Sequence, residues 1–580
     1  MTHPVISVED LCVRFGSHDA VKGLSFAIAP RETLALVGES GSGKSATALS
    51  ILRLIEREGG RIASGRILLR DGDAEIDLTA LSDADLTTVR GNHISMVFQE
   101  PMTSLNPVLT IGDQVGEVFI RHRGMGARQA LAAARDALDQ VRIPEPARRL
   151  AQYPHELSGG LRQRVMIAMA LACRPRLLIA DEPSTALDVT TQAEILDLIR
   201  SLQEEIGMAI LFITHDMGVV AEIADRVAVL RNGVKVEEAP VHALFAAPKA
   251  AYSRQLMAAT PKLGSGTCAK PAGSGCVLEV KDLSTRFPLR SGLLKRVQAE
   301  IHAVSNVSFS LAEGETLGLV GESGCGKSTL ARSVLRLIEP AAGTVRLAGQ
   351  TLTGLSADRL RPARRHAQMI FQDPFASLNP RLPVHELVTE PARIHGLVTA
   401  RDQRDLAVSL IEKVGLEADA IHRYPHQFSG GQRQRLCIAR ALSVKPKLIV
   451  ADEAVSALDV SIARQVTDLM LDLQEQEGLA FLFISHDMAV VERLSHRIAV
   501  MYGGRIVEMG PSAEILANPR HSYTKRLLAA VPTPDPERRR QDRSPVALSA
   551  PVIVRPRGET VPELPLQEIV PGHFVRTEAA

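Results

Sequence analysis

Short apolar runs recur along the chain, and each is followed by a polar or glycine-rich segment and then by a helical pattern. Thr33–Val37, Leu177–Ala180 and Ala209–Ile213 are runs of this kind. Their length and the lack of polar alternation are typical of strands buried on both faces of a parallel sheet. Val165–Cys173 has instead the apolar spacing of a helix. The pattern therefore predicts an α/β fold in which buried parallel strands alternate with helices.

This pattern occurs twice. Gly38–Ser45 (GESGSGKS) returns 283 positions later as Gly321–Ser328 (GESGCGKS). Further blocks recur in unchanged order, namely Phe98-Gln99 and Phe371-Gln372, Ser104–Pro107 and Ser377–Pro380, Tyr153–His155 and Tyr424–His426, Ser158–Gly160 and Ser429–Gly431, Asp181-Glu182 and Asp452-Glu453, and His215-Asp216 and His486-Asp487. A repeat that keeps its order indicates a tandem duplication.

The boundaries of the repeat predict four parts, a first domain over 1–261, a flexible linker over 262–276, a second domain over 277–532 and a C-terminal extension over 533–580. The linker is rich in Gly and Ser, as flexible tethers are. The extension is rich in Pro and Arg without sustained periodicity before Glu568–Val575, so we expect most of it to be extended and solvated. Where the halves differ in length, we expect a surface loop at Arg70–Thr79 and a peripheral insertion at Pro288–Ile301.

Composition narrows the function classes. The chain is 45% hydrophobic and 23% charged, which is typical of a folded, soluble protein. The 67 Lys and Arg balance 66 Asp and Glu, aromatic residues are 3% and Trp is absent, so no nucleic acid partner is expected. The six scattered cysteines exclude a disulfide framework, and Cys268 with Cys276 is interpreted as incidental rather than as a metal site. No signal peptide or membrane-spanning run is recognised, so a membrane-spanning part is expected in another chain.

Each GxxxxGKS segment stands between a buried strand and a helix, the setting that a phosphate-binding loop requires. The glycines let backbone N–H groups surround phosphate oxygens, and the helix N-terminus adds its positive end. The lysine would reach the β- and γ-phosphates, and the serine hydroxyl would ligate Mg²⁺. The predicted nucleotide-binding residues are Gly38, Glu39, Ser40, Gly41, Ser42, Gly43, Lys44 and Ser45, and Gly321, Glu322, Ser323, Gly324, Cys325, Gly326, Lys327 and Ser328.

Adjacent carboxylates end a buried strand in each half, as Asp181-Glu182 and Asp452-Glu453. Paired carboxylates at such a position are costly, and they are explained if the first binds Mg²⁺ beside the phosphates while the second activates water. A solvated pair is the alternative, which the upstream phosphate loop disfavours.

A histidine and a Ser-Gly-Gly segment complete each copy. His215 and His486 follow another buried strand at the end where α/β proteins bind ligands, which favours a γ-phosphate contact over an ordinary surface histidine. Ser158–Gly160 and Ser429–Gly431 each open a helix, as a second anion-binding terminus or as a simple N-cap.

Together with Gln99, Gln372 and the Ala-Leu-Asp segments at 186–188 and 457–459, these motifs resemble the ATP-binding cassette of ABC transporters, present twice over roughly 5–260 and 277–531. The resemblance implies two tandem P-loop NTPase domains of the RecA-like type, each with a helical and an antiparallel β subdomain. It also implies ATP and Mg²⁺ as cofactors and an intramolecular head-to-tail pairing of the halves.

In that pairing, the resemblance implies that the first half's phosphate loop shares ATP with Ser429, Gly431 and Gln432, and the second half's loop with Ser158 and Gly160. The implied catalytic residues are Glu182, Glu453, His215, His486, Gln99 and Gln372. The implied metal ligands are Ser45, Gln99, Asp181, Ser328, Gln372 and Asp452, and the implied adenine-stacking residues are Phe15 and Phe287. Leu161 and Ala454 depart from the family's frequent Gln and Pro, but no phosphate or metal ligand is lost, so we expect both sites to hydrolyse ATP.

Within the family, Ser-Leu-Asn-Pro, Tyr-Pro-His and Pro519–Pro532 resemble the peptide/nickel importer branch, and the stretches at 286–294, 451–462 and 571–574 are most similar to ATP-binding subunits of glutathione importers. The resemblance implies a peripheral subunit on the cytoplasmic face of the inner membrane that works with two transmembrane permease subunits and, indirectly, a periplasmic solute-binding protein. Glutathione or small peptides are the implied cargo. Dipeptide, oligopeptide or opine import in the same branch is an alternative. Less favoured is a soluble twin-cassette ATPase acting on ribosomes or DNA, which would have a long charged linker or zinc-binding cysteines.

Overall fold

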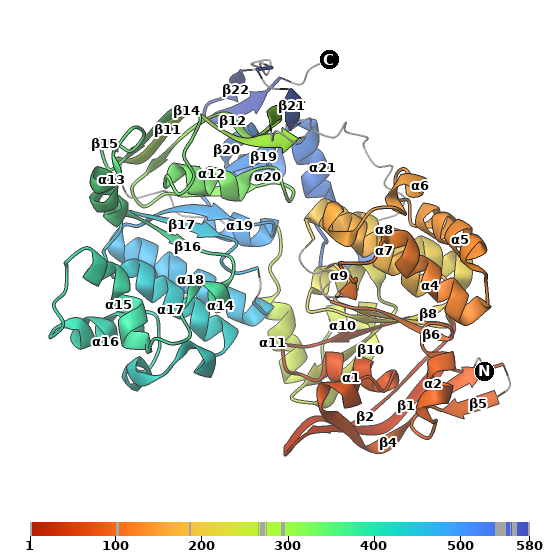
Figure 1. Cartoon of the computed structure of the whole chain (residues 1–580). Coiled ribbons are helices and arrows are strands. Elements are labelled where there is room, and N and C mark those ends of the chain that lie inside the picture. The colour runs from red at the N-terminus through yellow and green to blue at the C-terminus, as the bar shows by residue number, and fades with distance from the viewer. Residues whose placement is uncertain are drawn as a thin grey trace. The chain divides into compact units, whose positions relative to one another are not determined.

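A computed structural model of the chain describes residues 3–72, 74–99, 104–184, 187–264, 266, 273, 275–291, 296–456, 458–539, 553–556, 558–559 and 565–577. Two compact units are present (Figure 1). Unit 1 comprises Met1–Leu187, Thr191–Thr260 and Pro532–Arg543, and unit 2 comprises Asp188–Thr190, Pro261–Val531 and Ser544–Ala580. Most of the predicted linker, with Cys268, lies outside the described residues, as do 540–552, 557, 560–564 and 578–580 of the predicted extension.

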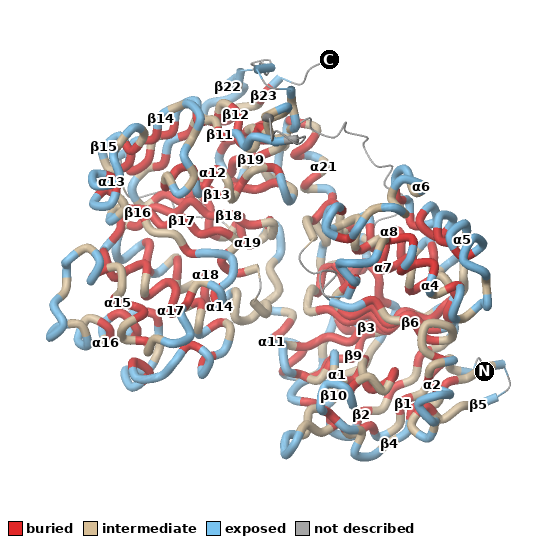
Figure 2. Tube along the Cα trace, viewed as in Figure 1, coloured by how far each residue is buried: buried red, intermediate tan, exposed pale blue. Residues whose placement is uncertain are grey.

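Unit 1 is built on two sheets. The antiparallel sheet has the order β2 (His18–Ile28), β1 (Ile6–Phe15), β4 (Gly60–Asp71) and β5 (Ala74–Asp77). The central sheet has the order β10 (Val234–Pro240), β9 (Arg226–Arg231), β3 (Thr33–Val37), β8 (Ala209–Ile213), β7 (Leu177–Asp181) and β6 (Ile94–Val97). All of its pairings are parallel except β9 with β10. Figure 2 shows the inner strands of this sheet as buried, as the apolar runs predict, whereas the edge strand β10 is partly exposed.

The helices of unit 1 cover the central sheet and form a helical subdomain. They are α1 (Lys44–Ile51), α2 (Asp83–Val89), α4 (Ile111–Arg123), α5 (Ala127–Gln140), α6 (Pro146–Arg149), α7 (Gly159–Leu171), α8 (Val189–Ile206), α9 (Met217–Ile223), α10 (Val241–Ala246) and α11 (Ala251–Ala259), with the 3-10 turns η1 (Ile55–Glu58) and η2 (Pro154–Glu156). In α4, the buried Ile111, Val115 and Phe119 recur every four residues and form one stripe against α5 and α7. This stripe makes the helical subdomain a part of the same core as strands β7 and β8.

Unit 2 repeats this architecture. Its antiparallel sheet has the order β15 (Gln350–Thr351), β14 (Ala342–Leu347), β11 (Cys276–Ser291), β12 (Arg296–Ala312) and β21 (Val554–Pro556). Its central sheet has the order β16 (Ala367–Ile370), β17 (Leu448–Asp452), β18 (Ala480–Ile484), β13 (Thr316–Val320), β19 (Arg497–Tyr502), β20 (Arg505–Pro511), β23 (His573–Arg576) and β22 (Leu566–Val570). The helices are α12 (Lys327–Val334), α13 (Ala357–Ala363), α14 (Pro374–Ser377), α15 (Val384–Ile394), α16 (Gln403–Lys413), α17 (Gly430–Leu442), α18 (Val460–Glu477), α19 (Met488–Leu494), α20 (Ser512–Ala517) and α21 (Ser522–Ala530), with η3 (Arg364–His366), η4 (Ala418–His422) and η5 (Pro425–Gln427).

One expectation about the variable segments is wrong. Arg70–Thr79 is not a loop, because β4 turns at Gly72 and pairs with β5 in an antiparallel hairpin. Two parts of the extension pack on the units, since η6 (Pro536–Arg538) contacts α9 and α10, and β23 pairs with β20. His573 Nε2 lies 2.8 Å from Glu508 Oε1, and both side chains are fully buried.

Among the described residues, no helix is long and apolar enough to cross a membrane.

Candidate functional site

The phosphate loop of unit 1 runs between the carboxyl end of β3 and the start of α1. Gly43 has a φ of 98°, in the left-handed region that favours glycine. A Cβ on Gly38 would collide with the carbonyl oxygen of Leu230, so the loop lies tightly against the end of β9. In unit 2, Gly326 has a φ of 106° and a Cβ on Gly321 would collide with the carbonyl oxygen of Met501. In both copies these loop positions therefore require glycine, because a side chain would collide with the neighbouring strand or would have to adopt an unfavourable φ.

The loop lysines are buried and turned back onto their own loops. Lys44 Nζ donates to the carbonyl oxygens of Gly38 at 2.7 Å and Glu39 at 3.0 Å. Lys327 Nζ makes the equivalent bonds at 2.7 and 3.0 Å in unit 2. These bonds hold an ammonium group inside the ring of the loop, where an anion would be bound by both the ammonium and the backbone N–H groups.

A serine of the loop contacts the first strand-end carboxylate in each unit. Ser45 Oγ donates to Asp181 Oδ1 at 3.3 Å, and Ser328 Oγ donates to Asp452 Oδ1 at 2.9 Å. Burial raises the pKa of Asp181 to about 6, and burial likewise raises the pKa of Asp452. A hydroxyl and a carboxylate that meet beside a phosphate loop are hard oxygen donors, which suit Mg²⁺, and a cation would offset the cost of burying the carboxylate.

The second carboxylate of each pair lies between a glutamine and a histidine. Gln99 Nε2 donates to Glu182 Oε2 at 2.9 Å, and His215 Nδ1 lies 3.1 Å from Glu182 Oε1. Glu182 has a φ of 46°, a strained conformation that turns it out of line with strand β7. The site thus gathers residues that are separated by more than a hundred positions in the chain.

The same cluster forms in unit 2. Gln372 Nε2 donates to Glu453 Oε2 at 2.8 Å, and His486 Nδ1 lies 3.7 Å from that oxygen. The contact with His486 lowers the pKa of Glu453. Burial opposes protonation of His486, but the Glu453 carboxylate outweighs it and raises the pKa of this histidine. The pair therefore favours an ionised carboxylate, the form that can accept a proton from water.

The Ser-Gly-Gly segments begin α7 and α17. Ser158 Oγ accepts from the backbone N–H of Leu161, and Ser429 Oγ accepts from that of Gln432, both at 3.4 Å. In unit 2 the side chain of Gln432 also bonds back to the N-cap residue, because its Oε1 accepts from the N–H of Ser429 at 3.0 Å. Leu161, at the same position in unit 1, has no polar side-chain atom for such a bond. Both serines are exposed N-caps. The pairing of each segment with the other half's phosphate loop, which would add Gly160 and Gly431 to the sites, stays a prediction.

The two candidate adenine-stacking aromatics lie in different surroundings. Phe15 ends β1 and packs against Gly60 and the core of the antiparallel sheet, with part of its ring accessible. Phe287 lies within β11 and is 37% exposed. Their stacking on adenine stays a prediction.

Sequence analysis missed a tyrosine that supports each loop. Tyr252 Oη in α11 accepts from the backbone N–H of Glu39 at 3.2 Å, and Tyr523 Oη in α21 accepts from that of Glu322 at 2.9 Å. Burial raises the pKa of Tyr523, so its hydroxyl stays neutral. The signal was present, because both tyrosines occupy the same place in the repeat.

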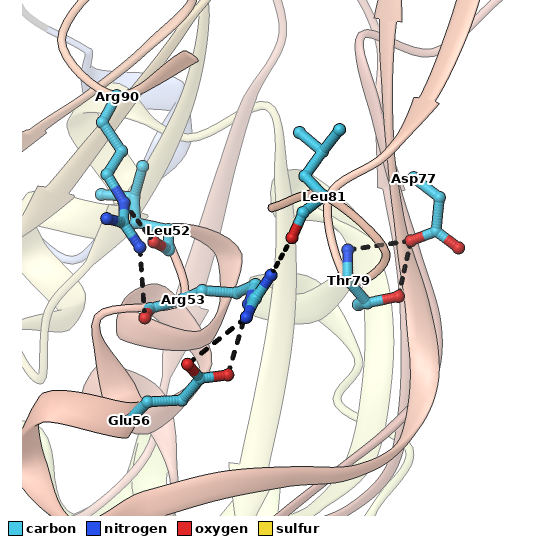
Figure 3. A network of polar contacts seen from close by, with 7 residues as sticks. All are labelled: Leu52, Arg53, Glu56, Asp77, Thr79, Leu81 and Arg90. Atoms are coloured by element: carbon cyan, nitrogen blue, oxygen red, sulfur yellow. Dashed lines mark hydrogen bonds and ion pairs between the residues drawn. The ribbon is translucent and has the colours of Figure 1, made fainter. Parts of the chain in front are cut away.

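Arginines fix the far end of the loop helix. Figure 3 shows the contacts of Arg53 and Arg90 around Leu52, the residue that caps the C-terminal end of α1. Arg90 Nε donates to the carbonyl of Leu52 at 2.8 Å, and Arg53 Nη1 donates to that of Leu81 at 2.5 Å. In unit 2, Arg364 and Arg336 bond the equivalent carbonyls. Cations at the C-terminal end of a helix also offset its dipole.

Several known proteins are similar in sequence to this chain. The family model described as ABC transporter matches residues 21–185 and 304–456, and the model described as oligopeptide/dipeptide transporter, C-terminal region, matches residues 507–552. The chain is 52% identical to the Glutathione import ATP-binding protein GsiA of Salmonella typhimurium, over 98% of this chain and 96% of that protein. The protein of that name from Escherichia coli matches with the same identity and coverage. The solved dimeric structure of a bacterial ABC transporter cassette is 29% identical over 40% of this chain and 98% of its own, with a TM-score of 0.37.

Proposed function

Because this chain belongs to the ABC transporter family, we propose that it is the ATP-hydrolysing subunit that energises import of glutathione or small peptides. The observation that carries the ATPase part is the cluster around Glu182, repeated at Glu453. In each cluster a carboxylate is oriented by a glutamine and a histidine beside a phosphate loop that holds its own lysine.

In the proposed mechanism, ATP binds with its phosphates in the loop, where Lys44 exchanges its carbonyl contacts for phosphate oxygens. Ser45 and Asp181 would hold Mg²⁺, whose charge offsets that of the phosphates. Glu182 accepts a proton from the attacking water, and Gln99 keeps the carboxylate oriented toward it. His215 contacts the other oxygen of Glu182 and is placed to donate toward the γ-phosphate. The corresponding roles in unit 2 belong to Lys327, Ser328, Asp452, Glu453, Gln372 and His486, although His486 lies nearest the same oxygen of Glu453 as Gln372.

The two units would pair head to tail, so that each ATP also contacts the Ser-Gly-Gly segment of the other unit. Closure on ATP and reopening after hydrolysis would drive two transmembrane permease subunits from the cytoplasmic face of the inner membrane, with a periplasmic solute-binding protein delivering cargo. The cargo is proposed from the 52% identity with proteins named for glutathione import. The match of 507–552 to the oligopeptide/dipeptide region favours short peptides as the second candidate cargo.

Hydrolysis is tested by replacing both Glu182 and Glu453 with Gln in the full chain. ATP binding should remain, while turnover should fall at least about 100-fold, because a general base typically contributes this much. Each single variant tests whether its own site turns over, and Glu205→Gln, on the exposed side of α8, is the control. Turnover that survives the double substitution would remove both carboxylates from the mechanism.

Cargo is tested by the uptake of labelled glutathione, and separately of a labelled dipeptide, in cells with and without the gene. Loss of glutathione uptake alone supports the first cargo. Loss of dipeptide uptake alone keeps the ATPase mechanism and moves the cargo to the second candidate.

A further inference from the structure

A cavity of about 310 Å³ opens in unit 1 at the end of the central sheet opposite the phosphate loop. Arg31 lines it from the turn between β2 and β3, and Arg200 and Glu204 from the last turns of α8. Asp225 lines it from the turn between α9 and β9, and Arg539 from the segment after η6. Arg539 belongs to the stretch Pro532–Arg543 that follows the second cassette yet is part of unit 1. The extension thus supplies one wall of a pocket on the first cassette.

The pocket is held in place by polar contacts. Gln203 Nε2 donates to the carbonyl of Arg31 at 3.1 Å, and Asp225 Oδ2 accepts from the N–H of Thr33 at 2.9 Å. Arg539 Nε donates to the carbonyl of Ala221 at 3.1 Å. Burial lowers the pKa of Arg539, and the nearby charge of Arg200 lowers it further, although Asp225 opposes this. Arginines from three separate segments therefore meet at this pocket, and Arg539 is partly withdrawn from water.

The duplication provides an internal comparison. In unit 2 the scaffold is kept, since Gln474 Nε2 donates to Thr316 Oγ1 as Gln203 Nε2 donates to Thr33 Oγ1. Glu475 keeps the acidic residue of Glu204, but the arginines and Asp225 are not kept, because Gly314, Leu471 and His496 stand at the positions of Arg31, Arg200 and Asp225. Shared folding requirements therefore do not explain the arginines of unit 1.

The charges of the lining indicate the ligand. Three arginines and two acidic residues line the pocket, so its lining carries one excess positive charge. A small peptide with two carboxylates and one ammonium group has the complementary charges, and the volume lies at the lower end for small-molecule sites. We propose that residues 532–539 and unit 1 form a binding site for such an anionic peptide, through which imported cargo regulates the ATPase. The choice of cargo rests on the proposed function.

Helix α9 connects this pocket to the catalytic cluster. Arg200 donates to the carbonyl of Glu222 and Arg539 to those of Ala221 and Ala224, at the C-terminal end of α9. The helix begins at Met217, two residues after His215. A peptide carboxylate that draws the guanidinium groups away from these carbonyls alters the support of the helix that follows the catalytic histidine.

The test is calorimetric titration of the full, nucleotide-free chain with glutathione. Saturable binding should weaken at least about tenfold in Arg539→Ala and in Arg200→Leu, because each removes a charged donor. Arg538→Ala is the matched control, because Arg538 is adjacent to Arg539 in the chain but its side chain is 77% exposed and pairs with Asp535. Arg200→Leu introduces the residue found at this position in unit 2, and an unchanged ATP affinity checks the fold of each variant.

Several outcomes would overturn the proposal. They are no binding at millimolar glutathione, equal weakening in Arg538→Ala, undiminished binding of glutathione dimethyl ester, and equal competition by inorganic phosphate or citrate. ATP turnover that does not respond to saturating glutathione would also overturn it. Because binding is measured without nucleotide, such a failure leaves the carboxylate test of the ATPase unaffected.

Discussion

Replacing Tyr523 by Phe would remove one hydroxyl from beneath the second phosphate loop and leave the ring in place. The ring of Tyr523 is fully buried, with its centroid 4.2 Å from that of Tyr502, so Phe retains the packing. Its hydroxyl accepts from the backbone N–H of Glu322 at 2.9 Å. The substitution thus isolates one hydrogen bond to the loop.

A neutral hydrogen bond contributes about 0.5–1.5 kcal/mol net, which corresponds to roughly 2- to 10-fold in a binding constant. Without this bond the loop also populates other conformations. The apparent ATP affinity then falls in proportion to the fraction of molecules whose loop can still bind ATP. We therefore expect Tyr523→Phe to weaken ATP binding at the second site by roughly 2- to 10-fold. The bond from Glu39 to Tyr252 is longer, at 3.2 Å, so Tyr252→Phe should weaken the first site less.

The assay is equilibrium binding of a fluorescent ATP analogue to chains with one working loop. Lys44→Ala isolates the second site for Tyr523→Phe, and Lys327→Ala isolates the first site for Tyr252→Phe. Tyr424→Phe is the control, because Tyr424 lies in unit 2 and is 40% exposed. Unchanged affinity in Tyr523→Phe, or an equal loss in Tyr424→Phe, would refute the idea that this hydroxyl orders the loop.

Three further changes test the scaffold of the sites. Burial raises the pKa of Asp181 from 3.8 to about 6, so its ionised form destabilises the nucleotide-free fold, and stability should decline as pH rises from about 4 to 6. In urea unfolding, Asp181→Asn should flatten that decline and gain stability at pH 7. Arg90→Met should lower the free energy of unfolding by about 1.5–3 kcal/mol, because two carbonyls lose a charged donor, whereas the exposed Arg57→Met should change little. Gln432→Leu should cost about 0.5–1 kcal/mol in thermal unfolding, because the N–H of Ser429 loses its partner.

Predictions from the local sequence agree with the structure for elements whose burial depends on their own residues. The strands that precede Gly38 and Gly321 are wholly buried, as their apolar runs predict, because a central parallel strand needs apolar residues on both faces. The contact of Gln99 with Glu182 joins residues 83 positions apart, and only the resemblance to a family suggested that both belong to one site.

The contacts of the extension with strand β20 could not be predicted from the local sequence. The extension has the composition of solvated chain, yet Glu508 provides a buried partner for His573, and Arg576 Nε donates to the carbonyl of Ile506 at 2.9 Å. These partners lie 65 and 70 positions away. No periodicity within the extension itself can indicate them.

The edges of the two central sheets explain why only one of them needs that extension. Strand β10 carries Lys235 and Glu238 in an ion pair, and charged side chains keep an open edge from pairing with other strands. Strand β20 has Ile506 and Met509 instead, and its interior is buried because β23 lies beside it. An apolar edge left open would pair with other chains, so the β22–β23 hairpin does for unit 2 what charged residues do for unit 1. The β22–β23 part of the extension is therefore a structural part of the second cassette, while the part that follows η6 supplies Arg539 to the first.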